Sequence, residues 1–185
     1  MNVDPFFLSR QEIIVVIVDI QERLAAVMGE RQKVIDNCLH ILKAASLLQV
    51  PVLVTEQYPK GLGPTVSEIK DALEAYEPIK KIAFNCCREP DFLNNIASSG
   101  RRKLVLTGME THICVLQSCL GLLKEDYSVH IASDAVCSRK KDNYKTAIEF
   151  MRDAGAVITC TETILFQMLE TAGTEEFKFI SNRIK

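Results

Sequence analysis

Three residues far apart in the chain have side chains that could act together on a carbonyl carbon. Asp19 follows an apolar run, Lys81 opens the stretch Lys-Ile-Ala-Phe, and Cys114 lies in the stretch Thr-His-Ile-Cys-Val. A thiolate attacks carbonyl carbons, a carboxylate moves protons, and an ammonium group stabilises a nearby anion. Each residue also has a structural interpretation: Asp19 could cap a helix, Lys81 could lie at the surface, and Cys114 could fill the core.

The surroundings of Cys114 favour a reactive thiol but no cysteine–histidine pair. A helix expected over residues 111–124 would place Cys114 in its first turn, where the helix dipole stabilises a thiolate. His112 is about 200° away around that helix, so its ring points away from the thiol. Cys119 is about 140° away and is expected to pack in the core. Because the three histidines do not converge, we expect no metal site and no cofactor.

The expected elements alternate between strands and helices along the whole chain. Residues 13–18 are six consecutive apolar residues, which is typical of a parallel strand buried on both faces. Further strands are expected at residues 52–54, 81–84, 103–107, 129–132 and 156–159, and helices at residues 31–49, 66–75, 91–98, 111–124, 142–153 and from about 162. We therefore expect one α/β domain over residues 1–185. Its predicted architecture is a Rossmann-like three-layer sandwich, with a central parallel sheet of about six strands and helices on both faces. Ligands of such sheets bind beyond the carboxyl ends of the strands.

The composition limits the partners that we expect. The chain of 185 residues has a net charge of -2 and a pI of about 6.0, without the basic bias of proteins that hold nucleic acid. No apolar run approaches the ~20 residues of a membrane span. Seven cysteines without a Cys-x-x-Cys pair, and no visible signal peptide, indicate free thiols in a cytoplasmic protein. The adjacent Cys86 and Cys87 are either two thiols in a loop or at the start of a helix, or a redox-sensitive pair beside Lys81.

The motifs around the three candidate residues resemble those of the isochorismatase-like cysteine hydrolase superfamily. They read VDIQ around Asp19, KIAF from Lys81 and GMETHICV around Cys114. Three further stretches, TEQYPKGLGPT, SDAVCSR and TETILFQML, are similar to the isochorismatase domain-containing and YcaC-type branch. The resemblance covers nearly the whole chain. It implies that Asp19, Lys81 (rather than Lys80) and Cys114 form a catalytic triad.

The resemblance also implies the remaining parts of the site. It implies a cis peptide bond between Met109 and Glu110, and an oxyanion hole made by the N–H groups of Glu110 and Cys114. We further expect four residues to contact the substrate: Gln21, Tyr58, Phe84 and Ile113.

The predicted reaction is the hydrolysis of an amide-like C–N bond in a small molecule. Lys81 and the helix N-terminus are expected to lower the pKa of Cys114, whose thiolate then forms a thioester. Asp19 protonates the leaving amine and afterwards activates water. Nicotinamidases of the superfamily have an Asp-x-His metal site where this chain reads Thr-Glu-Gln-Tyr at residues 55–58, so we expect no metal. True isochorismatases cleave a vinyl ether without a cysteine, so Cys114 favours C–N hydrolysis.

The alternative is a catalytically weak member of the family that acts as an oligomeric binding or assembly protein. In both cases we expect a homo-oligomer, as a dimer, tetramer or larger assembly. A nuclease or RNA-binding role, a label attached to some relatives, is disfavoured by the acidic pI of about 6.0.

Overall fold

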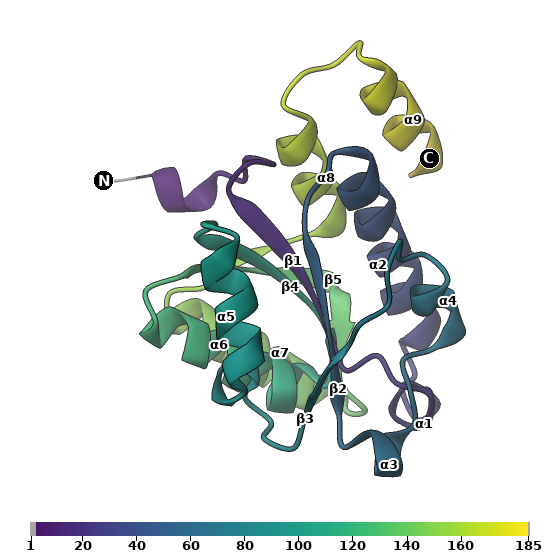
Figure 1. Cartoon of the computed structure of the whole chain (residues 1–185), viewed down its shortest axis with the longest axis vertical. Coiled ribbons are helices and arrows are strands. Elements are labelled where there is room, and N and C mark those ends of the chain that lie inside the picture. The colour runs from purple at the N-terminus through teal and green to yellow at the C-terminus, as the bar shows by residue number, and fades with distance from the viewer. Residues whose placement is uncertain (1–2, 185) are drawn as a thin grey trace.

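The computed structural model describes residues 3–184, which form three layers around one parallel sheet (Figure 1). The strands are β1 (Ile13–Val18), β2 (Val52–Gln57), β3 (Ile79–Lys81), β4 (Lys103–Met109), β5 (Ser128–Cys137) and β6 (Val157–Thr159). The helices and helical turns are η1 (Asp4–Phe6), α1 (Glu22–Ala25), α2 (Arg31–Leu47), α3 (Pro59–Leu62), α4 (Ser67–Lys70), η2 (Cys86–Arg88), α5 (Pro90–Ser98), η3 (Thr111–Val115), α6 (Leu116–Lys124), α7 (Lys141–Asp153), α8 (Thr161–Leu169) and α9 (Glu175–Arg183). The strands lie in the order β3-β2-β1-β4-β5-β6, and all neighbours are parallel. The predicted Rossmann-like fold is therefore confirmed.

Strand β1 is buried along its whole length because helices cover both faces of the sheet. Its odd-numbered residues belong to the apolar core that includes α2, α8 and α9, and its even-numbered residues belong to the core that includes α5, α6 and α7. Figure 1 shows these two groups of helices on opposite sides of the strands. Each buried Val or Ile side chain contributes about 1.5–3 kcal/mol. This burial fixes β1, and with it the residue that follows, Asp19.

The expected bounds of two elements near the edge of the sheet are wrong. The strand expected at residues 81–84 is instead β3, Ile79–Lys81. Ile82 and Phe84 are 71% and 50% exposed, so no burial extends this edge strand beyond Lys81. The helix expected at residues 66–75 is the short α4, which ends at Lys70. Residues 70–72 are exposed, so the sequence offers no apolar face to continue that helix.

The strand order reverses between β1 and β4, and the two strands come into close contact there. Val18 pairs with Gly108, whose φ is 113°. A Cβ atom at Gly108 would lie 2.0 Å from the carbonyl oxygen of Val18, so only glycine allows this approach. Open α/β sheets bind ligands at such a switch point, beyond the carboxyl ends of the strands. Asp19 follows β1 and Glu110 follows β4 at this place.

Candidate active site

Asp19 and Lys81 form an ion pair that is completely buried. Lys81 Nζ lies 2.7 Å from Asp19 Oδ2, and both side chains are 0% exposed. Asp19 has a φ of 51°, in the left-handed region that Asp tolerates better than most residues. The left-handed conformation turns the chain directly after β1. The helix-cap interpretation of Asp19 is wrong, because Gln21 occupies the N-cap position of α1.

The ammonium group of Lys81 is surrounded by oxygen atoms. Nζ donates to Gln57 Oε1 at 2.8 Å, to the carbonyl of Phe84 at 3.3 Å and to that of Ala83 at 3.4 Å. Burial is the largest single cause and lowers the pKa of Lys81, but the Asp19 carboxylate and the neighbouring Cys86 and Cys114 thiols together outweigh it, and the pKa lies above its usual value. Lys81 is therefore charged. Lys80, its neighbour in β3, is exposed.

The two oxygens of the Asp19 carboxylate differ in their contacts. Oδ1 accepts a hydrogen bond of 2.7 Å from Thr55 Oγ1. Among residues 3–184, Oδ2 has no donor in hydrogen-bond geometry, although Lys81 Nζ is 2.7 Å away. The contact between Lys81 and Oδ2 is therefore an ion pair. A buried oxygen without a donor is uncommon in folded proteins, and Oδ2 is free to accept a proton.

Cys114 lies in the π-helical turn η3, between β4 and α6. The continuous helix expected over residues 111–124 is therefore wrong at its start. The N–H groups of Ile113 and Val115 both donate to the carbonyl of Glu110, at 3.0 and 3.3 Å, which gives the first turn its wider spacing. Such π-turns are frequent at functional sites.

The pKa of the Cys114 thiol is raised, and the expectation of a lowered pKa is wrong. Burial is the largest cause, since Cys114 is only 4% exposed, and the Asp19 carboxylate acts in the same direction. Lys81 lowers the pKa but does not outweigh these two causes. Cys114 is thus close enough to Asp19 and Lys81 to interact with both charges. Its resting form at neutral pH is the thiol.

Glu110 connects the turn before Cys114 to the end of β5. The peptide bond between Met109 and Glu110 is cis, the conformation that the family resemblance implies. The Glu110 carboxylate is buried and accepts from the backbone N–H of Arg139 at 3.0 Å. Arg139 Nε lies 3.1 and 3.2 Å from its two oxygens. No local sequence pattern indicates this contact, which spans 29 positions.

Replacing Arg139 by alanine should lower the free energy of unfolding by about 1 kcal/mol, because the guanidinium group is 58% exposed and exposed ion pairs contribute little. The backbone N–H of residue 139 remains to bind Glu110. Urea denaturation of Arg139→Ala, with the exposed neighbour Lys140→Ala as the matched control, measures the difference. Equal stability of the two variants would mean that the ion pair has no role.

The other cysteines and His112 have contacts of their own. His112 Nδ1 lies 2.9 Å from Ser138 Oγ and Nε2 lies 3.2 Å from Asn143 Nδ2, so its ring is engaged away from the triad. Cys119 is fully buried in α6, where burial raises its pKa to about 12. Cys86 Sγ lies 3.9 Å from Thr55 Oγ1, and Thr55 is the residue whose hydroxyl binds Asp19. Cys86 therefore differs from an ordinary core cysteine, because its thiol contacts a residue of the site.

The four residues expected to contact the substrate differ in how far they are exposed. Gln21 is fully buried, and its amide binds the N–H and C=O of Gln57 and the carbonyl of Gly63. Because both ends of its amide are occupied, Gln21 stabilises the end of β2, and the expectation of a substrate contact is wrong. Tyr58 and Phe84 are 52% and 50% exposed at the ends of β2 and β3. Ile113 is half-buried, next to Cys114.

Two residues of the site were not identified in the sequence. Thr55 and Gln57 lie two positions apart in β2 and contact Asp19 and Lys81 respectively. The only sequence signal was their place at the carboxyl end of a parallel strand, beside β1. Threonine and glutamine are common at such ends for structural reasons, so the pattern alone could not distinguish them.

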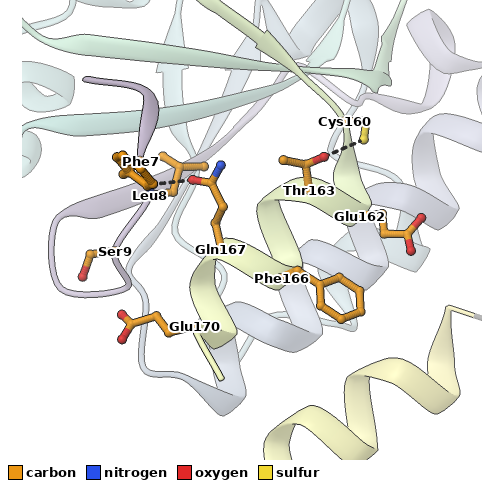
Figure 2. A pocket seen from close by; sticks show the side chains of 9 residues that line it. All are labelled: Phe7, Leu8, Ser9, Cys160, Glu162, Thr163, Phe166, Gln167 and Glu170. Carbon is orange, nitrogen blue, oxygen red and sulfur yellow. Dashed lines mark hydrogen bonds between the residues drawn. The ribbon is translucent and has the colours of Figure 1, made fainter. Parts of the chain in front are cut away.

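An open groove of about 800 Å³ lies away from the triad. It runs between residues 7–9 and helix α8, as Figure 2 shows, with Phe7 and Phe166 among its lining residues. Gln167 Oε1 accepts a hydrogen bond of 2.6 Å from the Leu8 N–H beside the groove. No residue of the triad lines this groove. The size of the groove therefore does not argue against the buried triad as the active site.

Within residues 3–184, no three Cys, His, Asp or Glu side chains converge as a metal ion requires. Over the same range, no helix combines the length and the apolar character needed to cross a bilayer.

Comparisons with known proteins support one family. A sequence model of the isochorismatase domain matches residues 13–163. A secreted isochorismatase effector (Isc1) of Phytophthora sojae is 41% identical over 172 residues, covering 90% of this chain and 81% of that protein. The structure of MAR1 ribonuclease from Caenorhabditis elegans aligns with a TM-score of 0.90 at 31% identity, covering 96% of this chain and 92% of that one. YcaC from Escherichia coli, described as an octameric hydrolase of unknown specificity, aligns with a TM-score of 0.89 at 21% identity, covering 96% and 90%. At that identity the likeness concerns the fold.

Proposed function

The chain belongs to the isochorismatase family, and on that basis we propose that it is a cysteine hydrolase that cleaves an amide-like C–N bond of a small molecule. The observation that carries the proposal is the fully buried Asp19–Lys81 ion pair, which interacts electrostatically with Cys114. A buried ion pair is a weak contribution to stability, because desolvation offsets much of the attraction between the charges. A charged pair beside a nucleophile, at the ligand-binding edge of the sheet, favours a catalytic role.

In the first step the thiol loses its proton as it attacks the carbonyl carbon. Because the pKa of Cys114 is raised, the thiol still holds its proton when the attack begins. In the proposed step Asp19 takes this proton on Oδ2, the oxygen without a hydrogen-bond donor among residues 3–184. The new S–C bond converts the carbonyl into a tetrahedral oxyanion. Lys81 stays charged throughout and stabilises the negative charge that passes from Asp19 to the substrate.

The second half of the reaction returns the enzyme to its starting state. The N–H groups of Glu110 and Cys114 are the proposed oxyanion donors, each of which contributes about 3 kcal/mol in known sites. The N–H groups of Ile113 and Val115 already bind a carbonyl and do not compete for this role. The C–N bond breaks as Asp19 gives its proton to the leaving amine. Asp19 then takes a proton from water, which hydrolyses the thioester and regenerates the thiol.

We expect no thiolate absorbance from Cys114 near neutral pH. A raised thiol pKa keeps the proton bound as pH rises through the range in which an ordinary cysteine ionises, near pH 8.5. The ultraviolet difference between wild type and Cys114→Ala, followed as pH rises from 6 to 9, should therefore stay near zero. A thiolate signal already present at pH 6 would contradict this account and favour a preformed thiolate.

A screen of small primary amides, ureides and N-acyl amines tests the reaction class. Release of ammonia or amine by wild type, with the carboxylate formed in equal amount, is the expected result. Hydrolysis of esters or vinyl ethers without any amide turnover would contradict the proposed C–N specificity.

A second candidate is RNA cleavage, because the Caenorhabditis elegans relative at 31% identity is described as a ribonuclease. The net charge of -2 provides little attraction for a phosphate backbone. Filter retention of labelled RNA at low and high salt distinguishes the two functions. Tight, salt-sensitive retention with cleavage would favour the nuclease.

We also propose that the chain forms homo-oligomers, as described for the YcaC neighbour.

A further inference from the structure

The hydroxyl group of Thr55 contacts the catalytic carboxylate from the neighbouring strand. Thr55 is fully buried and pairs with Val18, the last residue of β1. The pairing brings its side chain beside Asp19, which follows Val18 directly. Its Oγ1 donates to Asp19 Oδ1 at 2.7 Å, so one of the two carboxylate oxygens is already occupied.

Cys86 fixes the direction of that hydrogen bond. Cys86 is fully buried, and its Sγ donates to Thr55 Oγ1 at 3.9 Å. Burial raises the pKa of Cys86 to about 11, so this thiol keeps its proton and acts as the donor. Because the oxygen of Thr55 accepts from Cys86, its own proton is directed towards Asp19. The backbone N–H of Cys86 in turn donates to Ser118 Oγ at 3.0 Å, which anchors η2 on α6.

The second carboxylate oxygen of Asp19, Oδ2, remains available to accept a proton. Oδ2 has charge contact with Lys81 at 2.7 Å but no hydrogen-bond donor. The Gln57 amide contributes to this state, because its Oε1 accepts an N–H of Lys81 while its Nε2 donates to the carbonyl of Ile82 at 2.7 Å. The second bond fixes the orientation of the amide, so that its oxygen faces Lys81.

We propose that Thr55, oriented by Cys86, is a positioning residue that holds Oδ1 of Asp19 and thereby assigns Oδ2 to proton transfer with Cys114. The inference rests on the proposed function and adds a residue to its machinery. A hydrogen bond to a carboxylate favours the charged form over the neutral acid. Thr55 therefore favours the form of Asp19 that can take the proton of Cys114.

The test measures how fast acrylamide adds to Cys114 between pH 4 and 9, by mass spectrometry of the Cys114 peptide. Acrylamide forms an S–C bond with the thiol, whose proton passes through Asp19, so the reaction needs no knowledge of the substrate. In wild type the rate should fall towards acid pH, because a protonated base cannot take the thiol proton. In Thr55→Val, which keeps the shape and loses the hydroxyl, this fall should occur about one pH unit higher. Thr55→Ser should restore the wild-type profile.

Thr107→Val is the matched control. Thr107 is also fully buried in a central strand, and its hydroxyl donates to the carbonyl of Val16 at 3.1 Å, without contact to the triad. An unshifted profile in Thr107→Val supports a specific role of Thr55. No shift in Thr55→Val, an equal shift in both variants, or a wild-type rate without an acid fall would overturn the proposal.

Two further measurements keep the inference separate from folding and from the proposed function. If Thr55→Val does not fold, Thr55→Ala removes the same hydroxyl without a branched methyl group, and the same shift is expected. If wild type hydrolyses none of the amides screened but its acrylamide profile responds to Thr55 as described, the proposed function fails while the positioning role stands. If amide turnover depends on Cys114 but the acrylamide profile of Thr55→Val equals that of wild type, the proposed function stands and the positioning role of Thr55 fails.

Discussion

Cys114→Ala is expected to abolish amide hydrolysis while the protein remains folded. Loss of a nucleophile that forms a covalent intermediate lowers kcat by about 10⁴-fold or more in comparable enzymes. The fold should tolerate the change, because alanine differs from cysteine by one sulfur atom and leaves only a small cavity at this buried position. Amine release from the best substrate of the screen, together with a thermal unfolding curve, gives both quantities.

Cys119→Ala is the control for this variant. It also removes a buried thiol, five positions further along in α6, but one without contact to Asp19 or Lys81. We expect its kcat to equal that of wild type and its melting temperature to resemble that of Cys114→Ala. Turnover that survives in Cys114→Ala would exclude the thioester mechanism and support the alternative of a binding or assembly protein.

Lys81→Met should cost both stability and activity. Methionine fills a similar volume, but it leaves the Asp19 carboxylate buried without its counter-charge. Removing one partner of a buried ion pair typically costs about 3–5 kcal/mol, because the other charge stays behind. We also expect amide turnover to fall by at least about 100-fold, since no cation remains to stabilise the developing anion. Guanidinium denaturation and kcat measure the two effects.

Two companion variants separate the causes. Lys80→Met changes the exposed neighbour in β3 and should alter neither quantity. Adding Asp19→Asn to Lys81→Met removes the unpaired charge, and asparagine tolerates the φ of 51° found at this position. The double variant should regain most of the lost stability and none of the activity. A double variant as unstable as Lys81→Met would show that packing, and not charge, explains the loss.

The fold and the position of Asp19 were predictable from the sequence for a physical reason. The continuous apolar run of β1 requires burial on both faces, and the alternation of strands and helices then leaves a parallel sheet as the solution. Asp19 stands directly after that run, so its place at the carboxyl edge followed. Cys114 alone did not distinguish itself from a core cysteine, and the family motifs were needed to select it.

The electrostatics of the site could not be predicted in the same way. The sign of the pKa change at Cys114 depends on how far burial and Asp19 outweigh Lys81, and burial is a property of the whole fold. Gln21 stands in a family motif, yet its amide is used by the backbone of Gln57. Thr55 contacts Asp19 across 36 positions, a separation over which the sequence carries no local pattern. Partners of this kind depend on strand register, which becomes visible only in the assembled sheet.

Trapping the acyl group on the enzyme tests the central claim most directly. Wild type is mixed with the best amide substrate, quenched in acid during turnover, digested and examined by mass spectrometry. We predict that the peptide containing Cys114 gains the mass of the acyl portion, and that hydroxylamine, which cleaves thioesters, removes it. An acyl group on another residue, or steady turnover with no modified Cys114 peptide, would contradict a cysteine hydrolase built on Asp19, Lys81 and Cys114.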